Sequence, residues 1–366
     1  MQLGSSPMRA SKKFGRLPST HSTWLCTLQL AMKISSWMST RASTCTMHPK
    51  GSSAAESLAR LEQEDAYSMQ HSDFGRGLAS WQYHPQTGQQ TIGASRPIHF
   101  APANGMPAAT YLFFIEQLAK HGPVYTLDNR GAWPGVAEPA RQDDWWLHLE
   151  DFLAFAKSQY SEPIHYVGHS MGASVGMLAA LRHPQMFASI TMLDPGTVPS
   201  WQSALFMRLA PERIKQSMPL IKTTRARRKS WPTRQAFISY IRERRTYRNF
   251  SARALHDYAH GGLAECEDGV CLRFMPAWEA HNFKATVYVW GRMHKLKVPA
   301  VLVRGEHSGV FPPQRYREIN ARLTRTARRG RQPALQLKQL EGLGHMLPQE
   351  GLDPVLDVVL ANWARV

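Results

Sequence analysis

Short hydrophobic segments alternate with longer amphipathic ones along most of the chain. The short runs predict buried strands, and apolar positions spaced three and four residues apart predict helices. The strands are expected at 97–100, 124–127, 164–167, 189–193, 300–303 and 335–340, and the helices at 108–121, 143–159, 171–182 and 354–364. This alternation predicts an α/β fold with a mostly parallel, eight-stranded sheet covered by helices on both faces.

The pattern also divides the chain into parts. Segments 77–83 and 91–95 predict an opening hairpin, and the sheet core is expected to run from 77 to 195 and again from 286 to 366. Between them, residues 196–285 show basic, helix-like sequence without a clear strand-helix unit, which indicates a helical basic cap inserted into the sheet.

The first 55 residues contain no Asp or Glu and are rich in Ser and Thr, with scattered Lys and Arg. This composition is typical of a transit peptide, and it is equally expected for a stretch translated from upstream of the true start. We therefore expect residues 1–65 to be a disordered, targeting or spurious extension outside the fold.

A nucleophile motif follows the expected strand 164–167. Gly168-His169-Ser170-Met171-Gly172 reads Gly-x-Ser-x-Gly and leads directly into a helical segment, the context in which this motif forms a sharp nucleophile elbow. A sharp turn at the serine leaves no room for neighbouring side chains, which explains the two glycines. Gly176 is expected to let the helix pack closely against the sheet.

Ser170 needs a base, because a serine hydroxyl is a poor nucleophile until its proton is removed. His345 lies in the Gly-rich segment 341–348, after the last expected strand and before the last expected helix. The order Ser, acid, His along the chain requires the base at such a late position. We interpret His345 as the base, with His307 as the competing histidine.

Together these motifs resemble the α/β-hydrolase superfamily, in its serine-nucleophile branch with a cap domain, over residues 77–366. The segment 99–108 is also similar to the corresponding segment of one hydrolase group, and Asp128-Asn129-Arg130-Gly131 fits its Asp-x-Arg-Gly motif. Pro102 replaces the usual His of the oxyanion motif. The resemblance still implies backbone N–H donors for the oxyanion at Met171 and Asn104.

The acid is less easily assigned. Most of the superfamily carries Asp in a Gly-x-x-Asp motif after the seventh strand, whereas this chain has Gly305-Glu306-His307-Ser308, and a serine carries no charge to stabilise an imidazolium. Asp194 ends the preceding strand, 24 residues after Ser170, a position that some superfamily members use. We favour Asp194, and Glu306 remains the alternative.

Net charge changes the picture mainly for the cap. The chain has a formal charge of +17, and residues 205–255 contain fourteen Lys and Arg against only Glu212 and Glu243. Such a surface attracts anionic substrates or an anionic lipid surface, although a merely solvated basic face is equally consistent with it. Apolar residues between the charges suit an amphipathic cap over an acyl pocket.

Other chemistries have no supporting motif. The sequence lacks the glycine patterns of phosphate-binding loops and the His and Cys spacings of metal sites, so no cofactor or metal is expected, and nucleic acid is an unlikely partner. Cys266 and Cys271 flank an Asp-Gly turn signal; free thiols in a reducing compartment are favoured over a bridge. A cytoplasmic location is expected, or an organelle if the first 65 residues are a transit peptide.

These observations predict a serine hydrolase that cleaves carboxylic esters, including lipid or thioester substrates, through an acyl-enzyme. The acting residues would be Ser170, His345 and Asp194, and the partner a small-molecule ester or acyl substrate. Two alternatives remain open. One is a carbon-carbon bond hydrolase or acyltransferase that uses the same triad, and the other is a catalytically silent binding protein.

Overall fold

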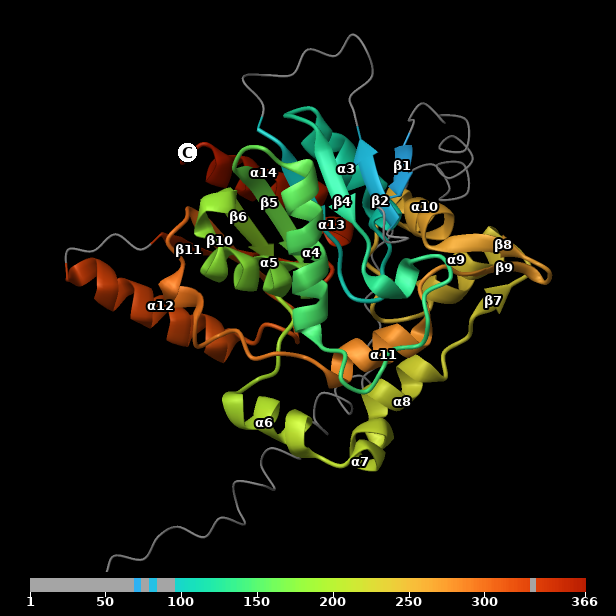
Figure 1. The fold of residues 1–366 in the computed structure, drawn as a ribbon. Helices are drawn as coiled ribbons and strands as arrows, with labels where there is room; N and C mark the ends of the chain where they lie inside the picture. Colours follow the sequence, from blue (N-terminus) through green and yellow to red (C-terminus); the bar gives the residue numbers. More distant parts are fainter. Residues whose placement is uncertain (1–68, 74–78, 84–95, 330–333) are drawn as a thin grey trace, which may run out of the picture. The chain divides into compact units, whose positions relative to one another are not determined.

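An eight-stranded β-sheet forms the centre of the fold (Figure 1). It belongs to a computed structural model that describes residues 69–73, 79–83, 96–329 and 334–366, all within one compact unit, Cys45–Val366. The strand order is β1-β2-β4-β3-β5-β6-β10-β11. The six strands from β4 to β11 in this order are parallel, and β1 and β2 run antiparallel at one edge. Their bounds are β1 Met69–Asp73, β2 Ala79–Tyr83, β3 Ile98–Ala101, β4 Val124–Leu127, β5 Ile164–His169, β6 Phe187–Leu193, β10 Ala300–Gly305 and β11 Leu335–Leu340.

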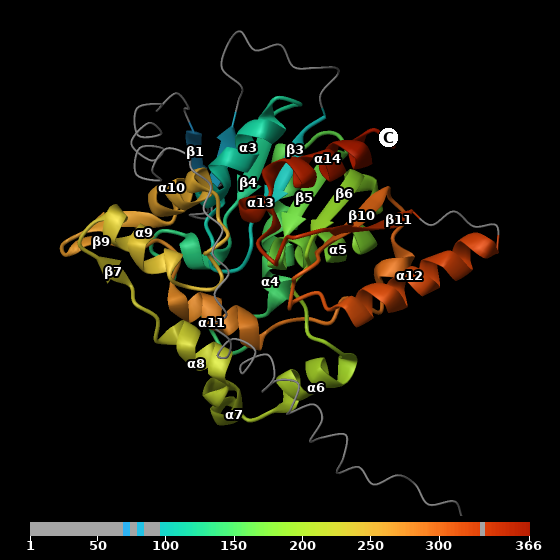
Figure 2. The same ribbon diagram turned by 180° about the vertical axis from the view of Figure 1, so that it is seen from behind.

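Helices cover both faces of the sheet. One apolar cluster lies on each face of the sheet. Helices α4, α5 and α12 contribute to one cluster, and α3 and α14 contribute to the other, as Figures 1 and 2 show from opposite sides. The bounds are α3 Leu112–Ala119, α4 Trp145–Gln159, α5 Met171–Arg182, α12 Pro313–Arg328, α13 Leu347–Glu350 and α14 Leu352–Trp363. Single turns of 3-10 helix lie at η1 Ala108–Tyr111, η2 Arg130–Ala132, η3 Pro184–Met186 and η4 Met293–Lys295.

The central strands are buried along their whole length because helices cover them on both sides. Every residue of β6 and of β10 is buried, which explains why these strands read as continuous apolar runs rather than as alternating ones. The parallel α/β class and the helix 171–182 are thus as predicted.

Some element boundaries differ from the expectation. The segment 108–121 divides into η1 and α3, and the basic helix α12 was not predicted. In the opening hairpin, β2 pairs with β1, eight residues before the expected start of the fold at 77. The segments 91–95 and 1–65 lie outside the described residues.

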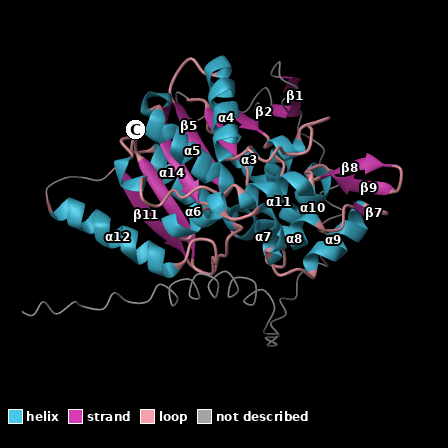
Figure 3. Ribbon diagram, turned by 60° about the horizontal axis from the view of Figure 1, so that its bottom comes forward, coloured by secondary structure: helices cyan, strands magenta, loops and turns pink. Residues whose placement is uncertain are grey.

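The insertion between β6 and β10 contains more than helices. Its helices are α6 Trp201–Leu209, α7 Glu212–Ser217, α8 Pro219–Arg225, α9 Arg234–Arg242, α10 Ala252–Gly261 and α11 Pro276–Lys284 (Figure 3). A three-stranded antiparallel sheet, formed by β7 Ser230–Trp231, β8 Leu263–Cys266 and β9 Gly269–Leu272, accompanies them. The prediction of a helical basic cap did not include this sheet, because its strands are short and only partly apolar.

The turn between β8 and β9 corrects a second expectation. The predicted tight turn is present, but Cys266 and Cys271 form a disulfide across it rather than remaining free. The two residues lie diagonally on adjacent antiparallel strands, with Cys266 opposite Gly269 and Cys271 opposite Ala264. Their Cα atoms are 6.0 Å apart, a distance that a disulfide spans.

Candidate active site

The nucleophile elbow places Ser170 alone at the carboxyl end of the sheet, between β5 and α5. Ser170 has φ 53°, a left-handed conformation that non-glycine residues rarely adopt. A side chain on Gly172 would approach the Ala101 carbonyl oxygen to 2.4 Å, and one on Gly168 would approach the backbone of Gly172 to 2.6 Å. The two glycines are therefore required by backbone packing, as the motif predicts.

Ser170, His345 and Asp194 form one hydrogen-bonded line. The Ser170 hydroxyl lies 3.1 Å from His345 Nε2, and Asp194 Oδ2 lies 2.5 Å from His345 Nδ1. The carboxylate accepts from the ring, so Nδ1 carries the proton and Nε2 is free to accept the serine proton. Three segments far apart in sequence thus meet at one edge of the sheet.

Asp194 is held rigidly at the end of β6. Its side chain is fully buried, its φ is 43°, and its backbone N–H donates to the Val303 carbonyl at 2.8 Å. Burial raises the pKa of Asp194 above its ordinary value, and the hydrogen bonds and charge of His345 together with the bond from Ser308 act in the opposite direction. His345 and Ser308 therefore offset part of the cost of burying the charged form of Asp194.

Ser308, which stands where most of the superfamily has Asp, is part of this arrangement. Its hydroxyl donates to Asp194 Oδ2 and accepts from the backbone N–H groups of Val310 and Phe311 at 3.1 and 3.2 Å. From the sequence, this position only lacked the usual Asp. In the structure, the serine that replaces it donates a hydrogen bond to the Asp194 carboxylate. Glu306, the alternative acid, instead accepts from the Gly342 N–H at 2.9 Å, and its side chain is 43% exposed.

The two expected oxyanion donors follow neighbouring strands, because Met171 comes after β5 and Asn104 after β3, which pairs with β5. Met171 is the first residue of α5 and Asn104 lies in the loop after β3, and no described acceptor bonds the backbone N–H of either. The Asn104 side chain contacts the cap: its Nδ2 donates to the Glu279 carbonyl at 3.0 Å, and its Oδ1 accepts from Asn282 at 2.9 Å. Asn104 thus connects the loop to α11.

Sequence reasoning missed a buried chain of hydrogen bonds beside Ser170. His169 Nε2 donates to the His345 carbonyl at 2.8 Å, which leaves Nδ1 to accept from the Tyr111 hydroxyl at 2.7 Å. The Tyr111 oxygen in turn accepts from the Ala103 N–H at 3.3 Å. Burial lowers the pKa of His169 to about 3, so this ring is neutral and acts as a strut between the oxyanion loop and the His345 loop. Only its place beside Ser170 in the motif hinted at this function.

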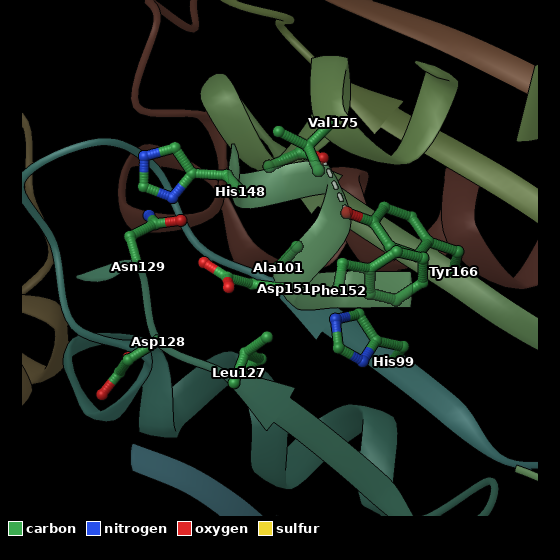
Figure 4. A pocket seen from close by; sticks show the side chains of 11 residues that line it. His99, Ala101, Leu127, Asp128, Asn129, His148, Asp151, Phe152, Tyr166 and Val175 are labelled. Carbon is green, nitrogen blue, oxygen red and sulfur yellow. Dashed lines mark hydrogen bonds between the residues drawn. The ribbon is translucent and has the colours of Figure 1, made fainter. Parts of the chain in front are cut away.

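A cavity of about 20 Å³ lies behind the elbow, lined by Ala101, Gly172, His99 and Asp151 among others (Figure 4). The Tyr166 hydroxyl closes one side by donating to the Gly172 carbonyl at 2.7 Å. The volume suits a single water molecule, and neither Ser170 nor His345 lines it. The cavity is therefore separate from the hydrogen-bonded line of Ser170, His345 and Asp194.

The described residues show neither a metal-binding cluster nor a membrane-spanning helix. They contain no group of three or more His, Cys, Asp or Glu side chains placed to hold a metal ion. No described helix combines the length and apolar character needed to cross a bilayer.

Comparison with known proteins identifies the family of this fold. Residues 104–351 match the family described as "Serine aminopeptidase, S33". The N-formylmaleamate deformylase of Pseudomonas putida is 22% identical over 261 residues, covering 71% of this chain and 86% of that protein. The ethanol acetyltransferase 1 of Kluyveromyces marxianus is 38% identical, but only over 72 residues, about a fifth of either protein.

Solved structures give the same fold at low identity. An E-2-(acetamidomethylene)succinate hydrolase has a TM-score of 0.61 at 17% identity, covering 82% of this chain and all of that one. The thioesterase domain of the curacin biosynthetic pathway has a TM-score of 0.59 at 15% identity, covering 81% of this chain and all of that domain. These likenesses establish an α/β-hydrolase fold.

Proposed function

The chain belongs to the serine aminopeptidase S33 family of hydrolases, and from this premise we propose that it cleaves carboxylic esters through an acyl-enzyme on Ser170. The observation that carries the proposal is the line of hydrogen bonds from Ser170 through His345 to Asp194. This arrangement both activates a hydroxyl and orients its base.

The steps follow from this geometry. Ser170 Oγ attacks the ester carbonyl carbon while its proton passes to His345 Nε2, and the oxyanion binds the backbone N–H groups of Met171 and Asn104. The carbon-oxygen bond to the alcohol then breaks as His345 returns the proton to the leaving oxygen. Water attacks the acyl-enzyme with His345 again as base, which releases the acid and regenerates the serine. Asp194 stabilises the imidazolium in both halves.

The test is release of 4-nitrophenol from esters of increasing acyl length by the full chain, beside the Ser170→Ala variant. We expect turnover that falls by at least about 10³-fold in Ser170→Ala. Equal turnover by the two proteins would overturn the proposal, and so would no turnover on any ester.

Acyl transfer is a second candidate, favoured by the similarity to ethanol acetyltransferase 1 over a fifth of the chain. An alcohol would then replace water in attacking the same acyl-enzyme. The same assay with added ethanol distinguishes the two, because a transferase forms the ethyl ester in a Ser170-dependent manner and a hydrolase forms the free acid.

We also propose an anionic lipid surface as the cap's partner, because apolar and basic side chains are exposed together on α6, α7 and α8. Five of the seven large hydrophobic side chains exposed in the described residues lie there, namely Trp201, Leu205, Leu209, Ile214 and Leu220. Exposed Arg208, Arg213, Lys222 and Arg225 lie among them. Such a combination favours the interface of an anionic membrane.

Co-sedimentation with vesicles tests this proposal. We expect the protein to bind phosphatidylglycerol-containing vesicles, and Trp201→Gln with Leu209→Gln to weaken binding by about tenfold or more. The control is Arg325→Gln with Arg328→Gln on α12, which removes exposed charge from a helix without an exposed apolar ridge. If the control weakens binding equally, or if no binding occurs, the cap has no specific lipid-facing surface.

A further inference from the structure

A buried ion pair links the cap to the loop beside the nucleophile. Arg227 follows α8 and Glu279 lies on α11, with 2.6 Å between Arg227 Nη1 and Glu279 Oε2. Their side chains are only 21% and 12% exposed. Arg227 is thus unlike most of the cap's bases, because it points into the protein rather than into solvent.

The ion pair with Glu279 is formed by Nη1 of the Arg227 guanidinium. Arg227 Nε and Nη2 are buried, and neither has an acceptor among the described residues. These two nitrogens form the side-on edge that matches the two oxygens of a carboxylate. Arg130 shows this use within the same chain, where its Nε and Nη2 hold both oxygens of Asp151 at 2.7 and 2.8 Å.

Two buried cationic N–H groups without an acceptor are costly, because their lost hydration is not replaced by hydrogen bonds within the protein. A neutral carbonyl presents a single oxygen and would satisfy this edge less completely. A carboxylate presents two oxygens in the matching geometry and also opposite charge. A carboxylate is therefore the ligand that best matches this unpaired edge.

The pair lies next to the oxyanion loop. A side chain on Gly105 would come within 2.5 Å of Glu279 Cδ, so the carboxyl group of Glu279 rests directly against this glycine. Asn104, one residue earlier, donates from its side chain to the Glu279 carbonyl. Arg227 is consequently separated from the loop that would hold the oxyanion by a single carboxyl group.

We propose that Arg227 binds a carboxylate carried by the substrate, through the unpaired Nε and Nη2 edge, so that this enzyme prefers acyl esters with a negatively charged group away from the scissile carbonyl. The inference rests on the proposed ester hydrolysis at Ser170. Because both nitrogens are buried, binding requires the neighbouring cap side chains to move apart and close again on the substrate.

The partner of Arg227 is suited to the arrival of a second carboxylate. Burial raises the pKa of Glu279 above its ordinary value, and the Arg227 charge opposes this rise. When a substrate carboxylate shares the guanidinium, Glu279 can take up a proton and the cluster retains one negative charge for one positive charge. Glu279 is therefore the group that we expect to take up a proton when an anionic substrate binds.

The kinetic test compares two esters of equal acyl length. Mono-4-nitrophenyl adipate carries a terminal carboxylate, and 4-nitrophenyl hexanoate is its neutral counterpart. We expect kcat/KM for the adipate ester to exceed that for the hexanoate by about tenfold or more. In Arg227→Gln this ratio should fall at least about tenfold through the adipate value, while the hexanoate value changes less than about threefold.

Three variants sharpen the result. Arg227→Lys keeps the charge but not the two-nitrogen edge, and should recover only part of the preference. Arg227→Gln with Glu279→Gln removes both charges and guards against misfolding from an unpaired Glu279. Arg325→Gln, on exposed α12, should leave the ratio unchanged. An unchanged ratio in Arg227→Gln, or an equal loss on both esters, overturns the inference.

A binding measurement separates this inference from the proposed chemistry. Titration of Ser170→Ala with adipate by calorimetry should show saturable binding with proton uptake, at least about tenfold weaker in Ser170→Ala with Arg227→Gln. Adipate binding without any ester hydrolysis by the unmodified enzyme would contradict the proposed function alone. Hexanoate hydrolysis that depends on Ser170, without adipate binding, would contradict the Arg227 site alone.

Discussion

The sheet core and the cap differ in where their apolar and charged side chains lie. In the core, β6 and β10 are buried throughout, and the strained residues Ser170 and Asp194 are held by surrounding backbone. In the cap, α6 leaves Trp201 and Leu209 more than half exposed, at 59% and 72%, while Arg227 is turned inward. The buried core therefore fixes the positions of Ser170 and Asp194, whereas the cap carries the exposed apolar side chains and the inward-facing Arg227 on which our proposals rest.

The largest effect should follow from breaking the core's hydrogen-bonded line at the acid. Asp194→Asn keeps the shape but offers a neutral partner that favours the wrong tautomer of His345, so kcat should fall by about 10³–10⁴-fold. Glu306→Gln is the matched control, because Glu306 bonds Gly342 and not His345. Steady-state kinetics on one 4-nitrophenyl ester compare the two, and a larger loss in Glu306→Gln would reverse the assignment.

The close packing of the elbow predicts the next effect. A side chain on Gly176 would approach the Tyr166 ring to 2.1 Å, and α5 cannot move away because it is buried against the sheet. Gly176→Ala should therefore destabilise the protein by about 2–3 kcal/mol, although Ala favours an isolated helix. Gly135→Ala is the control: φ there is 68° but nothing lies within 4 Å, so only about 1 kcal/mol is expected. Urea unfolding of both variants measures the difference.

Burial of the charged form of Asp194 should also lower the stability of the folded protein. Because burial raises its pKa above the ordinary 3.8, the native state binds more protons than the unfolded chain between the two values, and stability falls as pH rises through that window. Asp194→Asn lacks this loss. It should therefore be more stable than the unmodified protein by about 1 kcal/mol at pH 7, with a smaller gain at lower pH.

The measurement for this effect is urea unfolding at several pH values. Glu306→Gln serves as the comparison, because it also replaces a carboxylate with an amide, but at a side chain that is 43% exposed. A stability of Asp194→Asn below that of the unmodified protein at pH 7 would contradict the account of a buried, costly carboxylate.

The smallest effect is expected at the cap's disulfide. Cys266 and Cys271 close a loop with a sequence separation of only 5, and the β8–β9 pairing already holds their strands together. Reduction should therefore cost less than about 2 kcal/mol and leave ester hydrolysis within about twofold. Thermal unfolding and activity with and without dithiothreitol test this, with Cys266→Ser and Cys271→Ser together as control. A large loss would show that the hairpin supports the cap as a whole.

The core was largely predictable from the sequence because its physics is local. The strand, the Gly-x-Ser-x-Gly motif and the helix occur consecutively, so Ser170 and its glycines could be placed without a structure. Buried parallel strands are recognised in the sequence as apolar runs. The position of His345 followed from chain order. The structure then brings its ring between Ser170 and Asp194.

The remaining features depend on contacts between distant segments, which no local pattern reveals. The Ser308 hydroxyl can reach Asp194 only because β10 lies beside β6. The buried hydrogen bond between Tyr111 and His169 joins residues 58 positions apart. The small sheet of the cap was missed because strands of two and four residues are too short to show an alternating pattern in the sequence. Nor does any pattern distinguish Arg227 from the thirteen other bases around it.

Covalent capture of the nucleophile tests the central claim most directly. A fluorophosphonate should add one phosphonyl group, mapped by peptide mass spectrometry to Ser170, and labelling should vanish in Ser170→Ala and slow by at least about 100-fold in His345→Ala and Asp194→Asn. Modification of a different residue, or labelling of Asp194→Asn at the rate of the unmodified protein, would contradict the account of a serine activated through His345 by the acid of β6.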